Sequence, residues 1–210
     1  MKSSSCCFIV VFLPALFWHR TGAPARTDSH FIKEDKKMIR WKNQREETEE
    51  LSLAEKDGCI TIQSTVHHSA EEVHYSLELD RSWTFRKGSL RIGDRSLTLH
   101  ADGSGSWFDR EHGPIEELTG AIDIDISCTP FTNSLPINRM EWVQGRTVSM
   151  DVVYLSVPDL TFRKVTQHYT LLRDSNGIRE FRYQSPTYES SIFVDREGLV
   201  VDYPGLFLRI

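Results

Sequence analysis

The stretch Val73–Asp80 (VHYSLELD) decides the fold class of this chain. Its apolar residues occupy every second position, so Val73, Tyr75, Leu77 and Leu79 alternate with polar residues. Side chains of an extended strand point to alternate faces of a sheet. This period of two therefore predicts a strand with one face on a core and the other in water, since a helix would repeat every 3.6 residues.

The same alternation recurs on both sides of this stretch. It is seen at Ile60/Ile62, Leu97/Leu99, Ile122/Ile124/Ile126, Val148/Met150/Val152, Val165/Gln167/Tyr169/Leu171 and Leu199/Val201/Tyr203. Turn residues separate the runs, at Arg86–Gly88, Ile92–Asp94, Asp102–Gly105, Ser175–Gly177 and Arg196–Gly198. Around a dozen short strands joined by such turns predict an all-β, mainly antiparallel fold with few short helices.

Two segments have a helical composition instead. Asn43–Lys56 is charged nearly all round, which fits an exposed helix and an edge segment equally well, and Glu111–Leu118 is the other. No strand pair is separated by a clear amphipathic helix, which argues against a parallel α/β fold. We expect one domain over residues 38–210.

Residues 1–37 differ in kind from this domain. They carry six of the 25 basic and three of the 30 acidic side chains, so residues 38–210 have a net charge of −8. Lys2, the apolar run Cys6–Trp18 and the Ala23–Ala25 cleavage signal resemble a secretory signal peptide. The alternative is that translation starts at Met38. Either way, we expect residues 1–37 to be a disordered leader outside the fold.

Location depends on this leader. The protein is secreted or periplasmic if residues 1–25 act as a signal peptide, and cytoplasmic if translation starts at Met38. The apolar run is too short for a transmembrane segment, which needs about 20 residues. The acidic balance argues against a nucleic-acid partner, because neutralising phosphates requires clustered Lys and Arg. The sequence carries no signal for the oligomeric state.

A pair of aspartates is the first candidate for a binding or catalytic function. Asp123 and Asp125 lie two residues apart and so share one face of a predicted strand, although outward solvated charges have the same spacing. Paired carboxylates can act as acid and base or bind sugar hydroxyl groups. The following segment, 128–139, has two prolines and predicts a stiff loop carrying Thr132, Asn133 and Arg139 beside the carboxylates.

Aromatic residues at strand positions are the second candidate. Most belong to the core, yet Trp and Tyr near Arg and Asp also suit a groove for a sugar or an amphiphile. The candidates that we take from these strands are Trp83, Arg86, Trp107, Gln167, Tyr169 and Tyr183.

Metal and thiol chemistry receive less support. His67–His74 contains metal-ligand residue types, but it lies between two predicted strands and matches no zinc spacing, so a polar turn is the better interpretation. Cys59 and Cys128 are the cysteines of the domain; we expect two buried thiols, or a disulfide in a secreted protein. We predict no metal, cofactor or catalytic residue.

Four stretches together resemble the putative glycolipid-binding family. They are SWTFR with ADGSGSW around Trp83 and Trp107, AIDIDISCTPFTNSLPINRM (Ala121–Met140), VSMDVVYLSVPDL with QHYTLL, and FVDREGLVVDYPGLF (Phe193–Phe207). Their order spans about residues 41–210. Members of this family begin shortly before a Trp such as Trp41 and usually have no signal peptide, which favours Met38 as the start.

The resemblance implies a fold similar to bacterial lipoprotein carriers, in which an antiparallel sheet curls into a half-barrel around an apolar groove. It implies non-enzymatic binding of a glycolipid or other amphiphile, and it transfers no catalytic residue. The alternatives are an enzyme with Asp123 or Asp125 as acid-base and Arg139 as clamp, and a structural or interaction module with a filled groove.

Overall fold

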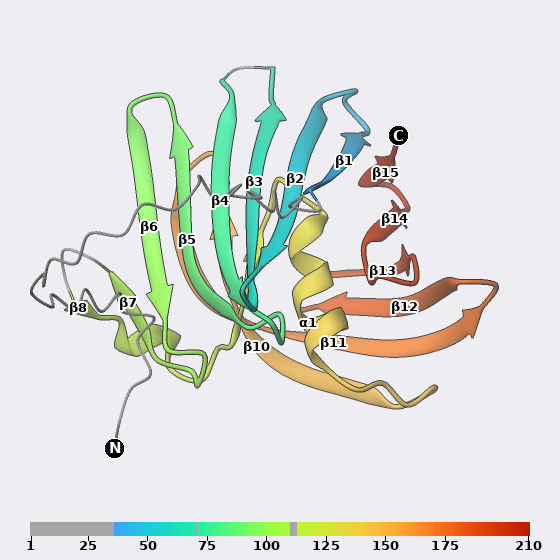
Figure 1. Ribbon diagram of the computed structural model, residues 1–210. Helices are drawn as coiled ribbons and strands as arrows, with labels where there is room; N and C mark the ends of the chain where they lie inside the picture. The colour runs from blue at the N-terminus through green and yellow to red at the C-terminus, as the bar shows by residue number, and fades with distance from the viewer. Residues whose placement is uncertain (1–35, 70, 110–112) are drawn as a thin grey trace, which may run out of the picture. The chain divides into compact units, whose positions relative to one another are not determined.

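The computed structural model describes residues 36–69, 71–109 and 113–210. The predictions for the leader up to residue 35 and for residues 110–112 fall outside these ranges. Residues 34–210 form one compact unit, which is the unit described below. Within its described residues, fifteen strands form one sheet that is curled but not closed (Figure 1).

The strands and helices follow one another along the chain. They are β1 (Lys36–Asn43), β2 (Thr48–Lys56), β3 (Cys59–His67), β4 (Val73–Asp80), β5 (Phe85–Ile92), β6 (Arg95–Ala101), β7 (Trp107–Asp109), β8 (Gly113–Pro114), η1 (Glu116–Leu118), β9 (Asp123–Ile126), η2 (Phe131–Asn133), α1 (Ser134–Arg139), β10 (Thr147–Ser156), β11 (Thr161–Ser175), β12 (Ile178–Ser185), β13 (Tyr188–Val194), β14 (Val200–Tyr203) and β15 (Phe207–Arg209).

The sheet consists of two meanders joined where β1 pairs with β15. From this junction β1 to β8 run outward in chain order on one side, and β15 to β9 follow on the other. Neighbouring strands are antiparallel except β9 and β10, which pair in parallel. The all-β, mainly antiparallel fold is thus confirmed.

Alternation places the core on the inner face of the curl. Val73, Tyr75, Leu77 and Leu79 are all buried on β4, as the period of two predicts. The inner residues of β1 to β7 pack in one cluster with residues from β9, β10, η2 and α1.

The interior of the curl is filled by the protein's own side chains. Ile124 and Ile126 of β9 pack against Leu77 and Leu99, and the cavity left among these side chains is about 10 Å³. A water molecule alone needs about that much space. The open apolar groove expected from the resemblance is therefore absent at this place among the described residues.

A second apolar cluster lies on the C-terminal meander. It contains Tyr169, Phe181, Tyr183, Ile192 and Tyr203 among others. Helix α1 contributes Leu135 to the first cluster and Ile137 to the second. In Figure 1 this helix, in yellow, is seen between the blue and teal strands and the orange ones. In the described residues no helix is long and apolar enough to cross a membrane.

Three sequence predictions are wrong in detail. Asn43–Lys56 is neither helix nor edge segment, because β2 runs from Thr48 to Lys56 and pairs with a strand on each side. The segment expected as a stiff loop forms η2 and α1. Residues 86–88 lie inside β5, and the β4–β5 turn comes earlier, at Trp83, whose φ is 64°.

The two cysteines of the domain are free thiols. Cys59 is exposed at the start of β3, contrary to the expected burial, and Cys128 is half-buried after β9. Burial and the neighbouring Glu49 charge raise the pKa of the Cys128 thiol well above its ordinary value. A thiol in such surroundings is a poor nucleophile.

Candidate functional site

A cavity of about 380 Å³ opens on the C-terminal meander. Strand β9 and the segment that follows it, strands β10 to β12, the β12–β13 hairpin and the turn from β14 to β15 supply its lining. This volume lies in the range of small-molecule sites. The lining is mixed, with acidic, amide, hydroxyl and aromatic groups facing one space.

Asp125 is the acidic group of this cavity. Gln167 Nε2 donates to its Oδ2 at 2.6 Å, and Thr132 Oγ1 donates to its Oδ1 at 3.2 Å. Burial raises the pKa of Asp125 above its ordinary value, and these two hydrogen bonds oppose the rise. Asp125 forms no ion pair with any residue that the structure describes.

Thr132 explains why this carboxyl group is held so firmly. It lies in η2, which four residues separate from the end of β9, and its hydroxyl oxygen also accepts the backbone N–H of Ile126 at 3.2 Å. The short helical turn therefore folds back onto the strand that carries Asp125. Thr132, seven residues after Asp125, is thereby brought back beside it.

Three tyrosines form the aromatic wall of the cavity. The ring centroids of Tyr183 and Tyr203 are 6.0 Å apart, those of Tyr188 and Tyr203 6.3 Å, and those of Tyr183 and Tyr188 6.5 Å. Burial is the main cause that raises the pKa of both Tyr183 and Tyr203. The negative charge of Asp125 raises it further. Asp125 and all three tyrosines line the same cavity.

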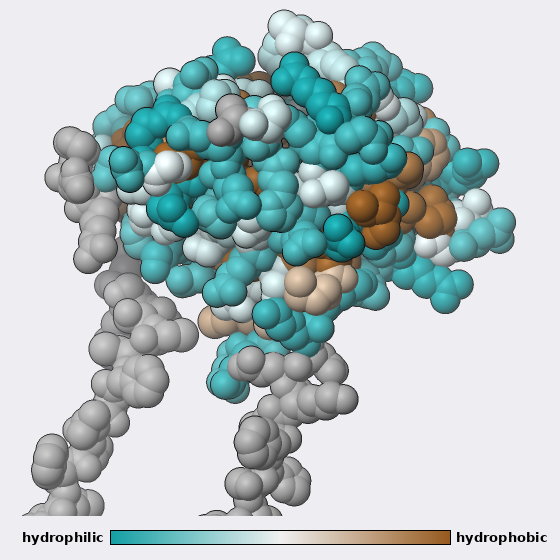
Figure 2. Space-filling view, turned by 90° about the horizontal axis from the view of Figure 1, so that it is seen from above, coloured by the Kyte–Doolittle hydropathy of each residue, from teal (hydrophilic) through white to brown (hydrophobic). Residues whose placement is uncertain are grey.

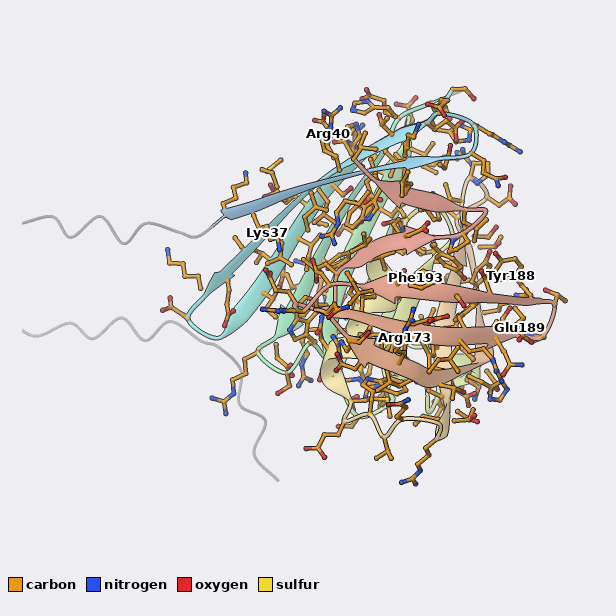
Figure 3. The ribbon with its side chains drawn as sticks, turned by 90° about the vertical axis from the view of Figure 1, so that its right-hand side faces the viewer. Lys37, Arg40, Arg173, Tyr188, Glu189 and Phe193 are labelled. Atoms are coloured by element: carbon orange, nitrogen blue, oxygen red, sulfur yellow. The ribbon has the colours of Figure 1, made fainter. Side chains whose placement is uncertain are left out.

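The mouth of the cavity is more exposed. Tyr188 is 38% exposed and lies beside Glu189 at the start of β13, at the end of the β12–β13 hairpin (Figure 3). Arg163 is exposed and its guanidinium lies 5.6 Å from the ring centroid of Tyr154. Leu206 is 37% exposed in the turn before β15. Figure 2 shows hydrophobic side chains gathered at one side of an otherwise largely hydrophilic face.

Asn133 lines the cavity, and two hydrogen bonds to residues outside the lining hold its side chain in place. Its Oδ1 accepts the Tyr169 hydroxyl at 2.9 Å, and its Nδ2 donates to the carbonyl oxygen of Pro130 at 3.2 Å. Tyr169 is 1% exposed and so lies behind the cavity surface. Tyr169 therefore positions a lining residue, while Asn133 faces the cavity.

Asp123 and Arg139 form an ion pair with each other. Arg139 Nε donates to Asp123 Oδ1 at 3.1 Å, and its Nη2 donates to Oδ2 at 2.6 Å. The Asp123 side chain is 1% exposed and the Arg139 side chain 20%. This two-point ion pair uses both carboxylate oxygens, and neither residue lines the cavity.

Trp83, Arg86 and Trp107 lie apart from the cavity lining. Trp107 is buried against Phe85 and donates Nε1–H to the Ala121 carbonyl at 2.7 Å. Trp83 is half-buried, with its ring centroid 6.3 Å from that of Phe131. Arg86 is paired with Asp80 at 2.7 Å on the surface. Each of these three residues contacts other residues of the protein, and these contacts explain its position without a ligand.

The structure therefore gathers part of the predicted set. Asp125, Asn133, Gln167 and Tyr183 line one cavity, with Thr132 and Tyr169 in support. Sequence reasoning did not select Tyr154, Arg163, Tyr188, Tyr203 and Leu206. The signal for two of them was the stretch around Tyr203-Pro204-Gly205-Leu206, whose Tyr and Leu flank a turn.

Comparisons with known proteins agree with this architecture. A solved DUF1089 family protein from Pseudomonas aeruginosa is 30% identical, with a TM-score of 0.66, over 77% of this chain and 92% of that chain. No significant match occurs among curated proteins. The model of the family described as "Putative glycolipid-binding" matches residues 38–209. Because this match spans nearly the whole described unit, the chain belongs to the putative glycolipid-binding family.

Proposed function

We propose that this protein binds the polar headgroup of a glycolipid or a similar amphiphile in the cavity bordered by Asp125 and the three tyrosines, without transforming it. The observation that carries this proposal is the meeting of an acidic acceptor, Asp125, with Tyr183, Tyr188 and Tyr203 in one cavity of about 380 Å³. Family membership supports a binding function in general.

The lining suits a sugar. Aromatic rings pack against the apolar face of a sugar ring, while carboxylate and amide groups bind its hydroxyl groups. Asp125 and Gln167 are already held to each other, so they are organised before the ligand arrives. Such preorganisation reduces the entropy cost of binding.

The apolar tail of the ligand can contact apolar side chains only at the opening of the cavity. Tyr188 and Leu206 are partly exposed there, and Phe207 is half-buried beside them in the lining. The interior of the curl offers about 10 Å³. The tail accordingly leaves the cavity along these three side chains and does not enter the core.

The enzymatic alternative receives less support from this geometry. It requires Asp123 or Asp125 as the acid-base and Arg139 as a clamp that faces the ligand. Arg139 instead holds Asp123 through two hydrogen bonds, away from the lining. Asp125 remains as the one carboxyl group of the lining, which suits hydrogen bonding to a ligand.

Binding of octyl β-glucoside below its micelle concentration tests the proposal. Isothermal titration calorimetry should give a saturable heat with the wild-type chain, and Leu206→Ala should weaken the affinity several-fold. Leu208→Ala is the matched control, because Leu208 is also exposed (45%) but lies outside the lining. Absence of saturable binding, or equal weakening by both variants, would overturn the assignment of the cavity.

A further inference from the structure

We infer that the headgroup bound in this cavity carries a positive charge, as a protonated amine or a quaternary ammonium group, and that Asp125 and the tyrosine wall recognise that charge. This inference rests on the proposed function, since it concerns the same cavity, and it adds the chemical class of the ligand.

The charge balance of the cavity is the first argument. Asp125 is half-buried in the wall of the cavity, and its two partners, Gln167 and Thr132, are neutral hydrogen-bond donors. Its neighbour on the same strand, Asp123, has a dedicated cation in Arg139. Buried charges in proteins are normally paired. Within the described residues Asp125, like Glu49, has no cation partner, but unlike Glu49 it lines the cavity, so a cation there would complete it.

Arg163 does not supply the missing charge. It lines the same cavity but is exposed, and its guanidinium lies over the ring of Tyr154. Asp125 accepts its hydrogen bonds from Gln167 and Thr132, and no ion pair joins it to Arg163 among the described residues. The arginine therefore leaves the acidic end of the cavity uncompensated.

The tyrosine wall is the second argument, and it is independent of the first. Aromatic rings attract cations within about 6 Å of their centroids, and clusters of inclined rings recognise ammonium groups. The planes of Tyr183 and Tyr203 are inclined by 72°, and those of Tyr188 and Tyr203 by 51°. Centroids only 6.0 to 6.5 Å apart leave no space between the rings. The cation would accordingly lie in the cavity against this wall, on the side of Asp125.

Two pairs of small probes separate charge from shape. Choline is compared with 3,3-dimethylbutan-1-ol, its neutral isostere, and glucosamine with glucose at a pH where the amine is protonated. Ligand-observed NMR or calorimetry should give an affinity at least roughly tenfold higher for the charged member of at least one pair. The pair that shows the preference identifies a quaternary ammonium or an amino sugar as the group recognised.

Charge-removing variants locate the recognition. Asp125→Asn keeps the shape and can still accept a hydrogen bond from Thr132, and it should abolish the preference for the charged probe. Asp151→Asn is the matched control: Asp151 lies on β10, accepts the Thr166 hydroxyl at 2.7 Å and does not line the cavity. This control should keep the preference within about twofold, because exposed charges at a distance are screened.

The outcomes separate this inference from the proposed function. Equal binding of charged and neutral probes would overturn the inference, and so would a preference that survives in Asp125→Asn. Octyl β-glucoside would still bind in either case if the cavity is a headgroup site. Loss of octyl β-glucoside binding as well would instead remove the proposed function.

Discussion

Glu49 presents an unusual arrangement at the scale of a single residue. It points inward from β2 and is 3% exposed, and its Oε1 accepts the hydroxyl groups of Tyr75 at 2.5 Å, Ser64 at 2.7 Å and Thr129 at 2.9 Å. Its Oε2 is buried without a partner among the described residues. Burial raises the pKa of Glu49 to about 7, although the three donors oppose the rise.

Glu49 should make the folded state less stable as pH rises from about 4.5 to about 7. Below 4.5 the carboxyl group is protonated in both the folded and the unfolded state. Between the two values the unfolded chain releases the proton first, so ionisation favours unfolding; above 7 both states are ionised and the effect is complete. The expected loss is about 3 kcal/mol.

Urea denaturation at pH 5 and pH 8 measures this effect. Glu49→Gln cannot ionise, so the difference in unfolding free energy between the two pH values should shrink by about 2–3 kcal/mol relative to the wild type, because part of the effect is already present at pH 5. Glu50→Gln is the control, because Glu50 is the exposed neighbour on the same strand, paired with Arg40 at 3.2 Å. A pH difference unchanged in Glu49→Gln would contradict the assignment.

The buried Asp123–Arg139 ion pair predicts how substitutions change the unfolding free energy. Arg139→Gln leaves a buried carboxylate without its cation, which should lower the unfolding free energy by about 3–5 kcal/mol. The double variant Asp123→Asn/Arg139→Gln should recover part of this loss, because no buried charge remains. Arg173→Gln removes an exposed partner of Glu180 and should cost at most about 1 kcal/mol in the same urea experiment.

At the scale of elements, strand β5 depends on a glycine. A Cβ atom at Gly88 would lie 3.0 Å from Leu77 Cδ2 and 3.0 Å from a ring carbon of Phe85, both in the core. Gly88→Ala should therefore destabilise the fold by about 1–3 kcal/mol through overpacking. Ser89→Ala, at the next position and on the opposite face of the strand, should cost less. Thermal unfolding of the two variants gives the comparison.

This glycine also shows where sequence patterns succeed and fail. The period of two predicts β4 because every second residue there is buried. Turn chemistry predicts a turn at Gly88, since glycine is common in turns, whereas in the structure Gly88 lies inside β5 and makes room for Phe85. The alternation is hard to see in β2 because Glu49 replaces an apolar residue on the inward face, which leaves Leu51 and Leu53 to mark it.

The candidate site was predictable only in part for a related reason. Asp125 and Thr132 are close in the sequence, so their spacing could indicate a contact. Tyr183, Tyr188 and Tyr203 come from three strands or their ends, and their meeting depends on how the hairpins stack. No local pattern distinguishes these tyrosines from the core aromatics Phe85 and Trp107.

At the scale of the whole molecule, the order of the strands decides where a ligand can lie. The β1–β15 junction lets the two meanders curl toward each other, and β9 brings Ile124 and Ile126 into the space between them. The interior is consequently a packed core. The cavity at Asp125 lies instead on the C-terminal meander, where η2 and α1 follow β9.

This arrangement predicts how affinity depends on the length of the ligand's tail. In an open apolar groove each additional CH₂ contributes about 0.8 kcal/mol, or roughly fourfold in affinity. Here the tail has only the surface of Tyr188, Leu206 and Phe207 at the mouth. The affinity of hexyl, octyl, decyl and dodecyl β-glucosides, measured by calorimetry below each micelle concentration, should rise over the first members and then level off.

The predicted plateau in affinity depends on the few side chains that the tail can contact at the mouth of the cavity. Substitutions there can therefore test it. Leu206→Ala should lower the level of the plateau, because it removes apolar surface at the mouth, whereas Leu208→Ala should leave it in place. A steady fourfold gain through the dodecyl glucoside would contradict the prediction. In that case the tail would have to enter the curl and displace Ile124, Ile126 and Leu155 from their packing against Leu77 and Leu99, since the cavity among these side chains is about 10 Å³. Displacing such a core costs several kcal/mol, which the contacts of a single alkyl chain would have to offset.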